Sequence, residues 1–486
     1  MRITAIIFIF VAIAALAATF TDPAPPEVQT PPESETTAAA ANGRVVFHRA
    51  PKPLASGATT HDWTQFLGPT HNLVSTESPL LAELPESGPT LVWEMETGAG
   101  YSAPAIQGDR LVYLHRMGDE EIVEALHPAT GERFWSFSYP TDFSDRYGYS
   151  NGPRASPVID DDRVYIYGAQ AKLHCLRLSD GAVLWQRDIL SEFEVPQDFF
   201  GVASTPLIED GKLIVTVGAP GGPTVAAFDK LTGALLWGAG EEWGAGYASP
   251  MPATVHGKRV IFVFAGGESR PPTGGLMLID PQDGTVHSTF DWRSKTFESV
   301  NAASPVIVGN QVLVSATYRT GAALLNIAPD LTLSTAWTLD DFDLHWTTAM
   351  EHEGHLYAFS GRNEPDASLT AVNIESGEIV WDEVLEWDET LEVNGSPREL
   401  SLSPYRAFLL KVDGRFLVLG EQGQLLWLDL SPDGPTILSK TTLFLSRQNW
   451  TPPVVSNGLL YVTQNGRDFI GGSNSRLLCY DLRAEN

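Results

Sequence analysis

The sequence predicts an all-β protein, a single eight-bladed β-propeller closed by an N-terminal strand. Three observations predict this fold. The chain is made of short apolar runs separated by turn residues, a pattern of about 50 residues recurs eight times, and the two ends of the array complement each other. Propellers have 4 to 8 blades of about four strands each, and their repeats have this period.

The composition is that of a globular, turn-rich protein. Of 486 residues, 43% are hydrophobic, and there are 43 Gly, 34 Pro and 13 Trp, which excludes a disordered or membrane-embedded chain. With 31 basic and 60 acidic residues the formal charge is -29. Such a charge repels phosphate backbones, so we expect no nucleic-acid partner.

The first residues have the features of an export signal. Arg2 precedes an apolar run from Ile3 to Leu16, and small residues suited to cleavage follow in Ala15-Leu16-Ala17. The run is shorter than the roughly 20 residues of a spanning helix. Residues 1–20 are therefore expected to be a signal peptide or, if uncleaved, an N-terminal anchor and the only membrane contact. We expect an exported protein of the periplasm or cell envelope.

Two further regions follow. Residues 21–58 are rich in Pro, Thr, Ala and Glu and lack an apolar period, which predicts a flexible linker. Residues 59–486 hold the repeats and are expected to form the propeller.

The stretch 204–240 shows one repeat most clearly. Apolar and β-branched runs at 204–208, 213–218, 224–229 and 234–237 are separated by Gly, Pro and Asp, which predicts four short strands. One such sheet cannot bury both faces alone, so it needs neighbours like itself.

Most repeats open with Ser/Thr-Pro and end with Gly-x-x-x-Trp. We expect the indole to pack against the adjacent blade with its N–H on a backbone carbonyl, and the turn Gly to adopt positive φ. A degenerate repeat runs from about Ala407 to Leu438. The tryptophans predicted to dock the blades are Trp93, Trp135, Trp185, Trp237, Trp337 and Trp381.

The ends of the array predict how the ring closes. The eighth repeat stops after its third strand at Leu477–Leu482, whereas Leu91-Val-Trp93 before the first repeat is a fourth-strand motif without a blade. Pairing the two would complete the last sheet and remove exposed edges.

The segments Phe228–Trp237, Leu126–Trp135 and Val372–Trp381 resemble the pyrroloquinoline-quinone (PQQ) repeat of quinoprotein alcohol dehydrogenase-like propellers. They are equally similar to the propellers of BamB-type outer-membrane assembly proteins, which share the repeat and bind no quinone. His61–Pro69 resembles the opening segment of exported PQQ-repeat proteins, and the resemblance covers about 59–486. It implies the fold, and leaves two functions open.

The favoured interpretation is an exported non-catalytic propeller that binds envelope proteins or a small polar or planar ligand, with no cofactor. It is favoured because no set of acid, base, nucleophile or metal ligands emerges, so no catalytic or metal residue is assigned. The alternative is a PQQ- and calcium-dependent alcohol or sugar dehydrogenase. For such an enzyme the resemblance implies bound Ca²⁺ and commonly an adjacent Cys-Cys pair, and this chain lacks that pair.

Several polar features have a structural interpretation beside a functional one. Asp160-Asp161-Asp162 is interpreted as a solvated turn and not as a site for Ca²⁺, which needs 6 to 8 oxygen ligands. His115 and Arg116 are interpreted as part of a solvated loop with ion pairs. Cys175 and Cys479 are interpreted as buried free thiols, with a disulfide as the alternative.

The candidate binding site lies where each blade enters its innermost strand, three residues before the Pro or its equivalent. A closed ring would gather these positions at one mouth of the channel, suited to stacking a planar or carbohydrate ligand and to pairing with carboxylates. The alternative is that these side chains wedge between blades. We expect the double change Arg154→Ala with Trp346→Ala to leave the unfolding midpoint nearly unchanged. The positions are Tyr101, Arg154, Ala203, Tyr247, Ala302, Trp346, Arg406 and Trp450.

Overall fold

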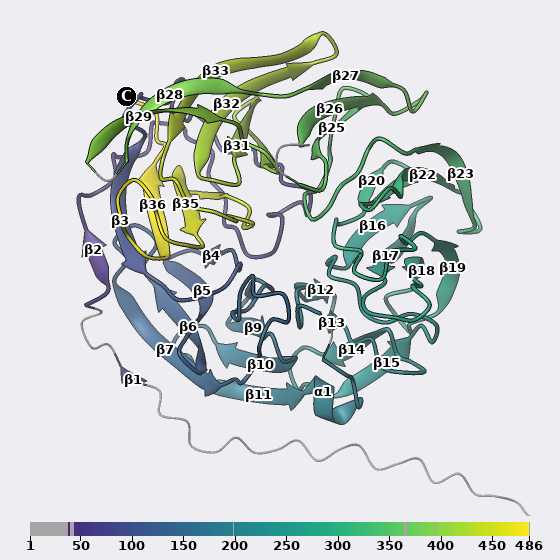
Figure 1. The fold of residues 1–486 in the computed structure, drawn as a ribbon. Helices are drawn as coiled ribbons and strands as arrows, with labels where there is room; N and C mark the ends of the chain where they lie inside the picture. The colour runs from purple at the N-terminus through teal and green to yellow at the C-terminus, as the bar shows by residue number, and fades with distance from the viewer. Residues whose placement is uncertain (1–36, 39–42, 198, 364–366, 394, 486) are drawn as a thin grey trace, which may run out of the picture.

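The protein is a ring of β-sheets around a central channel (Figure 1). The computed structural model describes residues 37–38, 43–197, 199–363, 367–393 and 395–485. The predicted export signal at 1–20 lies outside the described residues. Within them the one helix is the four-residue α1 (Ile189–Glu192). The prediction of an all-β, eight-bladed propeller is confirmed.

Seven blades are antiparallel sheets whose strands follow chain order from the channel outward (Figure 1). Blade 1 has β4 (Ala105–Gln107), β5 (Arg110–Met117), β6 (Glu120–Leu126) and β7 (Arg133–Pro140). Blade 2 has β8 (Val158–Asp160), β9 (Arg163–Tyr167), β10 (Lys172–Arg177) and β11 (Val183–Asp188). Blade 3 has β12 (Leu207–Glu209), β13 (Lys212–Thr216), β14 (Val225–Asp229) and β15 (Leu235–Ala239).

The remaining blades repeat this plan. Blade 4 has β16 (Met251–Val255), β17 (Lys258–Ala265), β18 (Gly275–Ile279) and β19 (Val286–Asp291). Blade 5 has β20 (Val306–Val308), β21 (Gln311–Ala316), β22 (Gly321–Ile327) and β23 (Leu333–Leu339). Blade 6 has β24 (Met350–His352), β25 (His355–Ser360), β26 (Ser368–Asn373) and β27 (Ile379–Glu383). Blade 7, the degenerate repeat, has β30 (Phe408–Val412), β31 (Arg415–Leu419), β32 (Gln424–Ser431) and β33 (Gly434–Thr442).

Blade 8 is built from both ends of the chain, as predicted. Its strands are β34 (Val454–Ser456), β35 (Leu459–Gln464), β36 (Arg476–Asp481) and β3 (Thr90–Glu96). Trp93 lies opposite Cys479 and Met95 opposite Leu477 in an antiparallel ladder. The ring is therefore closed by hydrogen bonds between the first and the last strand of the array.

Two short strands from the segment expected to be a linker join the outside of the ring. β1 (Thr37–Ala38) pairs with β7, and β2 (Val45–Phe47) pairs with β3. Each adds a fifth strand to the outer edge of its sheet. Part of the segment 21–58 is thus held against blades 1 and 8.

The predicted tryptophans dock the blades in the predicted way. Each indole N–H donates to a backbone carbonyl of the following blade. The acceptors, with their distances, are Pro128 for Trp93 (2.7 Å), Leu178 for Trp135 (2.9 Å), Lys230 for Trp185 (3.0 Å), Pro281 for Trp237 (3.2 Å), Ile374 for Trp337 (2.8 Å) and Ser431 for Trp381 (2.9 Å).

The turn glycine is required for packing as well as for its backbone conformation. Gly181 has φ +75°, as expected for the hairpin, and a Cβ there would lie 2.6 Å from the Trp135 ring of the preceding blade. The same contact, at 2.7 Å, joins Gly284 to Trp237. Tryptophan and glycine therefore act as a pair across each of these blade boundaries.

The Ser/Thr before the Pro links neighbouring blades near the channel in blades 1 to 4. The N–H of Ala103 donates to Ser156 Oγ, that of Ser156 to Thr205 Oγ1, and that of Thr205 to Ser249 Oγ, each at 3.0 Å. This explains why β12 begins at Leu207, after the predicted start at 204: the preceding residues hydrogen-bond between blades and not within their own sheet.

The segment 62–75, here called the channel floor, lies inside the ring, where Figure 1 draws it in purple. It contacts the innermost strands beyond the points where they begin at the predicted mouth. Its backbone hydrogen-bonds with Ile106 of blade 1, Ile159 of blade 2 and Lys411 of blade 7. Trp63, Leu67 and Leu73 are buried in the same core as the blades. The sequence did not predict this crossing.

A hairpin between blades 6 and 7 was also not predicted. β28 (Trp387–Val393) and β29 (Ser396–Leu402) form a separate two-stranded sheet. The Thr442 hydroxyl of blade 7 donates to Glu389 at 3.0 Å, and Lys440 lies 5.6 Å from the Trp387 ring centroid. The hairpin therefore packs against the outer strand of blade 7.

Candidate functional site at the channel mouth

All eight positions named from the repeat line one cavity of about 560 Å³ at the mouth of the channel. The regular entry of each blade into its innermost strand brings them together, as the sequence predicted. Tyr101 and Tyr247 are each 8% exposed, and Trp346 and Trp450 are half-buried. Phe66 of the channel floor contributes to the same lining. Ligand binding by these residues stays a prediction.

Aromatic side chains form a continuous chain along one side of the cavity. We call Tyr247, Phe200, Tyr149, Trp450, Trp346 and Phe408 the aromatic belt. Successive ring centroids along it lie 5.6, 6.0, 5.2, 5.9 and 5.0 Å apart. Tyr101 packs beside the belt, 5.2 Å from Trp450. Three belt members, Phe200, Tyr149 and Phe408, were not predicted as site residues.

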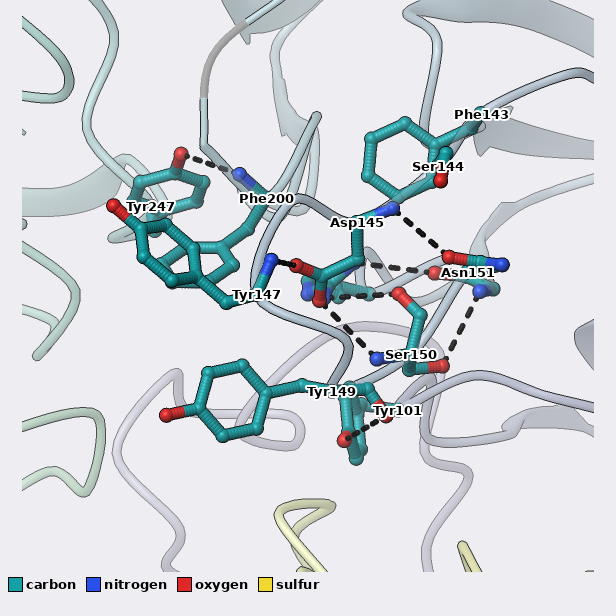
Figure 2. Close-up of polar contacts among 12 residues, drawn as sticks. Tyr101, Phe143, Ser144, Asp145, Tyr147, Tyr149, Ser150, Asn151, Phe200 and Tyr247 are labelled. Atoms are coloured by element: carbon teal, nitrogen blue, oxygen red, sulfur yellow. Dashed lines mark hydrogen bonds and ion pairs between the residues drawn. The ribbon is translucent and has the colours of Figure 1, made fainter.

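Arg154 is held by a buried carboxylate. Its Nη2 lies 2.7 Å from Asp145 Oδ2, and the Asp145 side chain is fully buried. Asp145 also accepts hydrogen bonds from the N–H of Tyr147 at 2.8 Å and of Ser150 at 3.1 Å (Figure 2). The ion pair therefore shapes the loop that presents Tyr149 to the cavity.

This contact changes the expectation for the double variant. Removing the Arg154 guanidinium would leave the Asp145 carboxylate buried without its cation, a change that typically costs about 3–5 kcal/mol. The variant Arg154→Ala is therefore expected to lower the unfolding midpoint, and not to leave it unchanged. This ion pair could not be predicted from the sequence, because Asp145 lies in a loop outside the repeat pattern.

Arg406 is held in the same manner. Its Nε donates to Glu421 Oε2 at 2.9 Å, and its Nη2 contacts Glu421 Oε1. The Trp450 indole N–H donates to the same Oε1 at 2.6 Å, so Glu421 orients one cation and one ring of the belt. Its side chain is fully buried. The degenerate repeat thus places Arg406 at the mouth, as its predicted register required.

One polar atom at the cavity, Trp346 Nε1, lacks a hydrogen-bond partner within the described part of the chain. Burial, with the nearby charges of Arg406 and Arg362, lowers the pKa of His345 to about 3, so this imidazole is neutral at pH 7. Both residues line the cavity.

The other polar features predicted from the sequence lie away from the mouth. Asp160 contacts Lys230, and Asp161 has φ +53° in the turn between β8 and β9, so this cluster is a turn. His115 and Arg116 do not form a solvated loop. Both are buried on β5. His115 Nε2 hydrogen-bonds with the buried Glu124 at 3.1 Å.

Both cysteines, Cys175 and Cys479, are free and buried, as expected. Within the described ranges no group of three or more His, Cys, Asp and Glu side chains is arranged to hold a metal ion. Among the same residues, no helix has the length and apolar character needed to cross a membrane.

The repeats and their closure define the class: an eight-bladed propeller of PQQ-type repeats with an aromatic channel mouth. A family model described as outer membrane protein assembly factor BamB matches residues 118–364, just over half of the sequence. The chain belongs to this family. The outer membrane protein assembly factor BamB of Yersinia pestis is 23% identical over 401 residues, which cover 80% of this chain and 79% of that protein.

Solved structures share the fold at low sequence identity. BamB from Moraxella catarrhalis superposes with a TM-score of 0.52 at 16% identity, covering 82% of this chain and 98% of that one. A europium-containing methanol dehydrogenase gives a TM-score of 0.62 at 10% identity, covering 87% and 98%. Quinohemoprotein alcohol dehydrogenase from Comamonas testosteroni gives 0.61 at 12%, covering 87% and 81%. At these identities the likeness establishes the fold alone.

Proposed function

We propose that this chain is an exported, non-catalytic propeller of the cell envelope that binds a partner at the mouth of its channel. The family supports the envelope and a protein partner, since its relatives are described as outer membrane protein assembly factors. The predicted signal at 1–20 supports export.

The observation that carries the proposal is the aromatic surface at the mouth. Tyr149 is 44% exposed and Tyr147 46% exposed, although both are large rings on a loop fixed by Asp145. Exposed rings on a rigid support are typical of binding hot spots, because they bury much area at little entropic cost. The mouth is therefore built for recognition.

The second candidate is the PQQ- and calcium-dependent dehydrogenase. It is favoured by the aromatic belt, on which a planar acid could stack, and by arginines at the cavity. The residues do not fit the calcium ion, which needs 6 to 8 oxygen ligands. The two buried carboxylates at the mouth, Asp145 and Glu421, are already engaged by Arg154 and Arg406.

A complementation experiment tests the binding proposal. In a strain lacking the gene, wild-type protein should restore the amount of assembled outer-membrane protein, and Tyr149→Ala should restore less. Phe469→Ala is the matched control, because Phe469 is an equally exposed ring, at 44%, that does not line the cavity. Full restoration by Tyr149→Ala would show that the mouth is not the partner site.

A reconstitution assay tests the alternative. Purified protein is incubated with PQQ and Ca²⁺, and dye reduction is followed with alcohols and sugars. We expect no turnover above that of the cofactors alone. Turnover that requires the protein would establish the dehydrogenase and remove the non-catalytic proposal.

A further inference from the structure

We infer that the channel mouth is a blind well that binds an uncharged carbohydrate of one or two sugar rings. The inference rests on the proposed function, because it assigns a small ligand to the site proposed for recognition. Five observations carry it: the floor, the size, the aromatic belt, the paired charges and the unpartnered indole N–H.

The floor makes the channel a well. Segment 62–75 is tied to the innermost strands of blades 1, 2 and 7, and its Phe66 lines the cavity whose other residues lie at the mouth. A ligand that reaches Phe66 therefore enters from the mouth. The volume of about 560 Å³ lies within the roughly 300–1,000 Å³ of small-molecule sites.

The aromatic belt provides faces for stacking. An aromatic ring is negative on its face, and the C–H groups of a sugar ring carry a slight positive charge on one side. Trp450 and Trp346 have centroids 5.9 Å apart, and the Arg406 guanidinium lies 5.4 and 5.8 Å from them. Tyr149, 5.2 Å from Trp450 and 44% exposed, offers the most open face. Such a surface binds a ring that has apolar faces and polar edges.

The charges of the well cancel, which disfavours an anionic ligand. Arg154 is paired with Asp145, and Arg406 with Glu421. Arg362 lies 4.0 Å from the Tyr318 ring centroid, and the cavity also contains the carboxylate of Glu298. An anionic ligand would meet arginines whose charges are already neutralised by protein carboxylates. The hydroxyl groups of a neutral ligand, in contrast, can hydrogen-bond with either member of an ion pair.

The unpartnered indole N–H favours a ligand with hydroxyl chemistry. Trp346 Nε1 is a donor only. A hydroxyl oxygen can accept from it. Buried polar atoms without partners are costly, so a ligand that supplies this bond gains affinity.

The test measures binding of defined sugars to the full chain. Tryptophan fluorescence and calorimetry are recorded with maltose, cellobiose, N,N′-diacetylchitobiose and, as the charged counterpart, glucuronate. We expect a neutral disaccharide to bind in the millimolar range or tighter, and glucuronate to bind more weakly. Saturation by glucuronate alone, or no binding by any neutral sugar at about 50 mM, would overturn the inference.

Variants locate the binding in the well. Tyr149→Ala keeps the carbonyl that accepts from the Tyr101 hydroxyl, and it should weaken sugar binding about tenfold or more. Trp346→Phe keeps a ring and removes the unpartnered donor, so it should also weaken binding. Phe469→Ala should leave it unchanged. Equal affinity for all three variants would place the sugar elsewhere and refute the assignment.

The two proposals fail in different ways. If Tyr149→Ala impairs complementation while no neutral sugar binds, the mouth is a partner site without a carbohydrate, and only this inference is lost. If sugar binds and Tyr149→Ala complements fully, the proposed function is lost instead.

Discussion

At the scale of residues, the boundary between blades depends on one recurring contact. The tryptophan of one blade lies on the turn glycine of the next and donates to a carbonyl of that turn region, as Trp135 does with Gly181 and Leu178. The sequence predicted the indole hydrogen bond and the positive φ. It did not predict that the glycine also makes room for the ring, because that contact joins two different repeats.

A pair of glycine variants separates these two roles. Gly181 and Gly354 both have φ +75°. A Cβ at Gly181 would lie 2.6 Å from Trp135, whereas a Cβ at Gly354 would have no atom within 4 Å. Gly181→Ala should therefore destabilise the protein by about 1–3 kcal/mol more than Gly354→Ala, through overpacking. Urea unfolding midpoints measure the difference. Equal shifts would mean that backbone strain alone matters.

The buried His174 predicts a dependence of stability on pH. It lies on β10 with its ring centroid 4.4 Å from that of Tyr139, and burial, with the charge of Lys172, lowers its pKa from 6.5 to about 3. Between these values the unfolded chain binds a proton that the folded protein does not. The free energy of unfolding should therefore fall as pH drops from about 6.5 towards 3, with no contribution above 6.5.

His174→Gln provides the comparison, since glutamine is polar and does not titrate. The unfolding midpoint of the wild type should fall more steeply below pH 6.5 than that of the variant. Parallel curves would show that His174 is protonated equally in both states.

At the scale of elements, the strands of each blade were predictable from the repeats, whereas the segments that connect the blades were not. The Ser/Thr-Pro entry and the surplus strand at Leu91–Trp93 gave the blades, the closure and the eight positions that line the cavity. Asp145 and Glu421 escaped prediction because they come from loops outside the repeated positions. The β28–β29 hairpin and the channel floor escaped because both depend on contacts with distant blades, which no local pattern encodes.

The closing strand predicts a clear difference between two aspartate variants. Val92 on β3 is fully buried, whereas Val46 on the neighbouring β2 is 50% exposed. Val92→Asp should place a charge in the core of blade 8, detach β3 and expose the edge of β36, so the protein should aggregate. Size-exclusion chromatography is the measurement. Val46→Asp should elute as the wild type does, and similar behaviour of both variants would contradict the role of β3.

At the scale of the whole molecule, the net charge and the closure of the ring affect the stability of the fold. The formal charge of -29 is spread over a ring that has no open end in its series of blades. A high net charge keeps the protein soluble. It also opposes folding, because like charges repel most strongly when the chain is compact.

Added salt should therefore stabilise the protein. Raising NaCl from about 10 mM to 150 mM shortens the Debye length from roughly 30 to 8 Å and screens the repulsion. The thermal unfolding midpoint should rise over this range. A falling midpoint would mean that attractive surface ion pairs, which salt also weakens, outweigh the overall repulsion.

The closure of blade 8 also sets an order of events in time. Trp93 is made early and Cys479 late, yet the two lie opposite each other in one ladder. While the ribosome is still making the later blades, β3 has no partner strand, and a long loop must then close before the ladder forms. During synthesis the incomplete ring has two unpaired strand edges, and these favour aggregation until β36 pairs with β3.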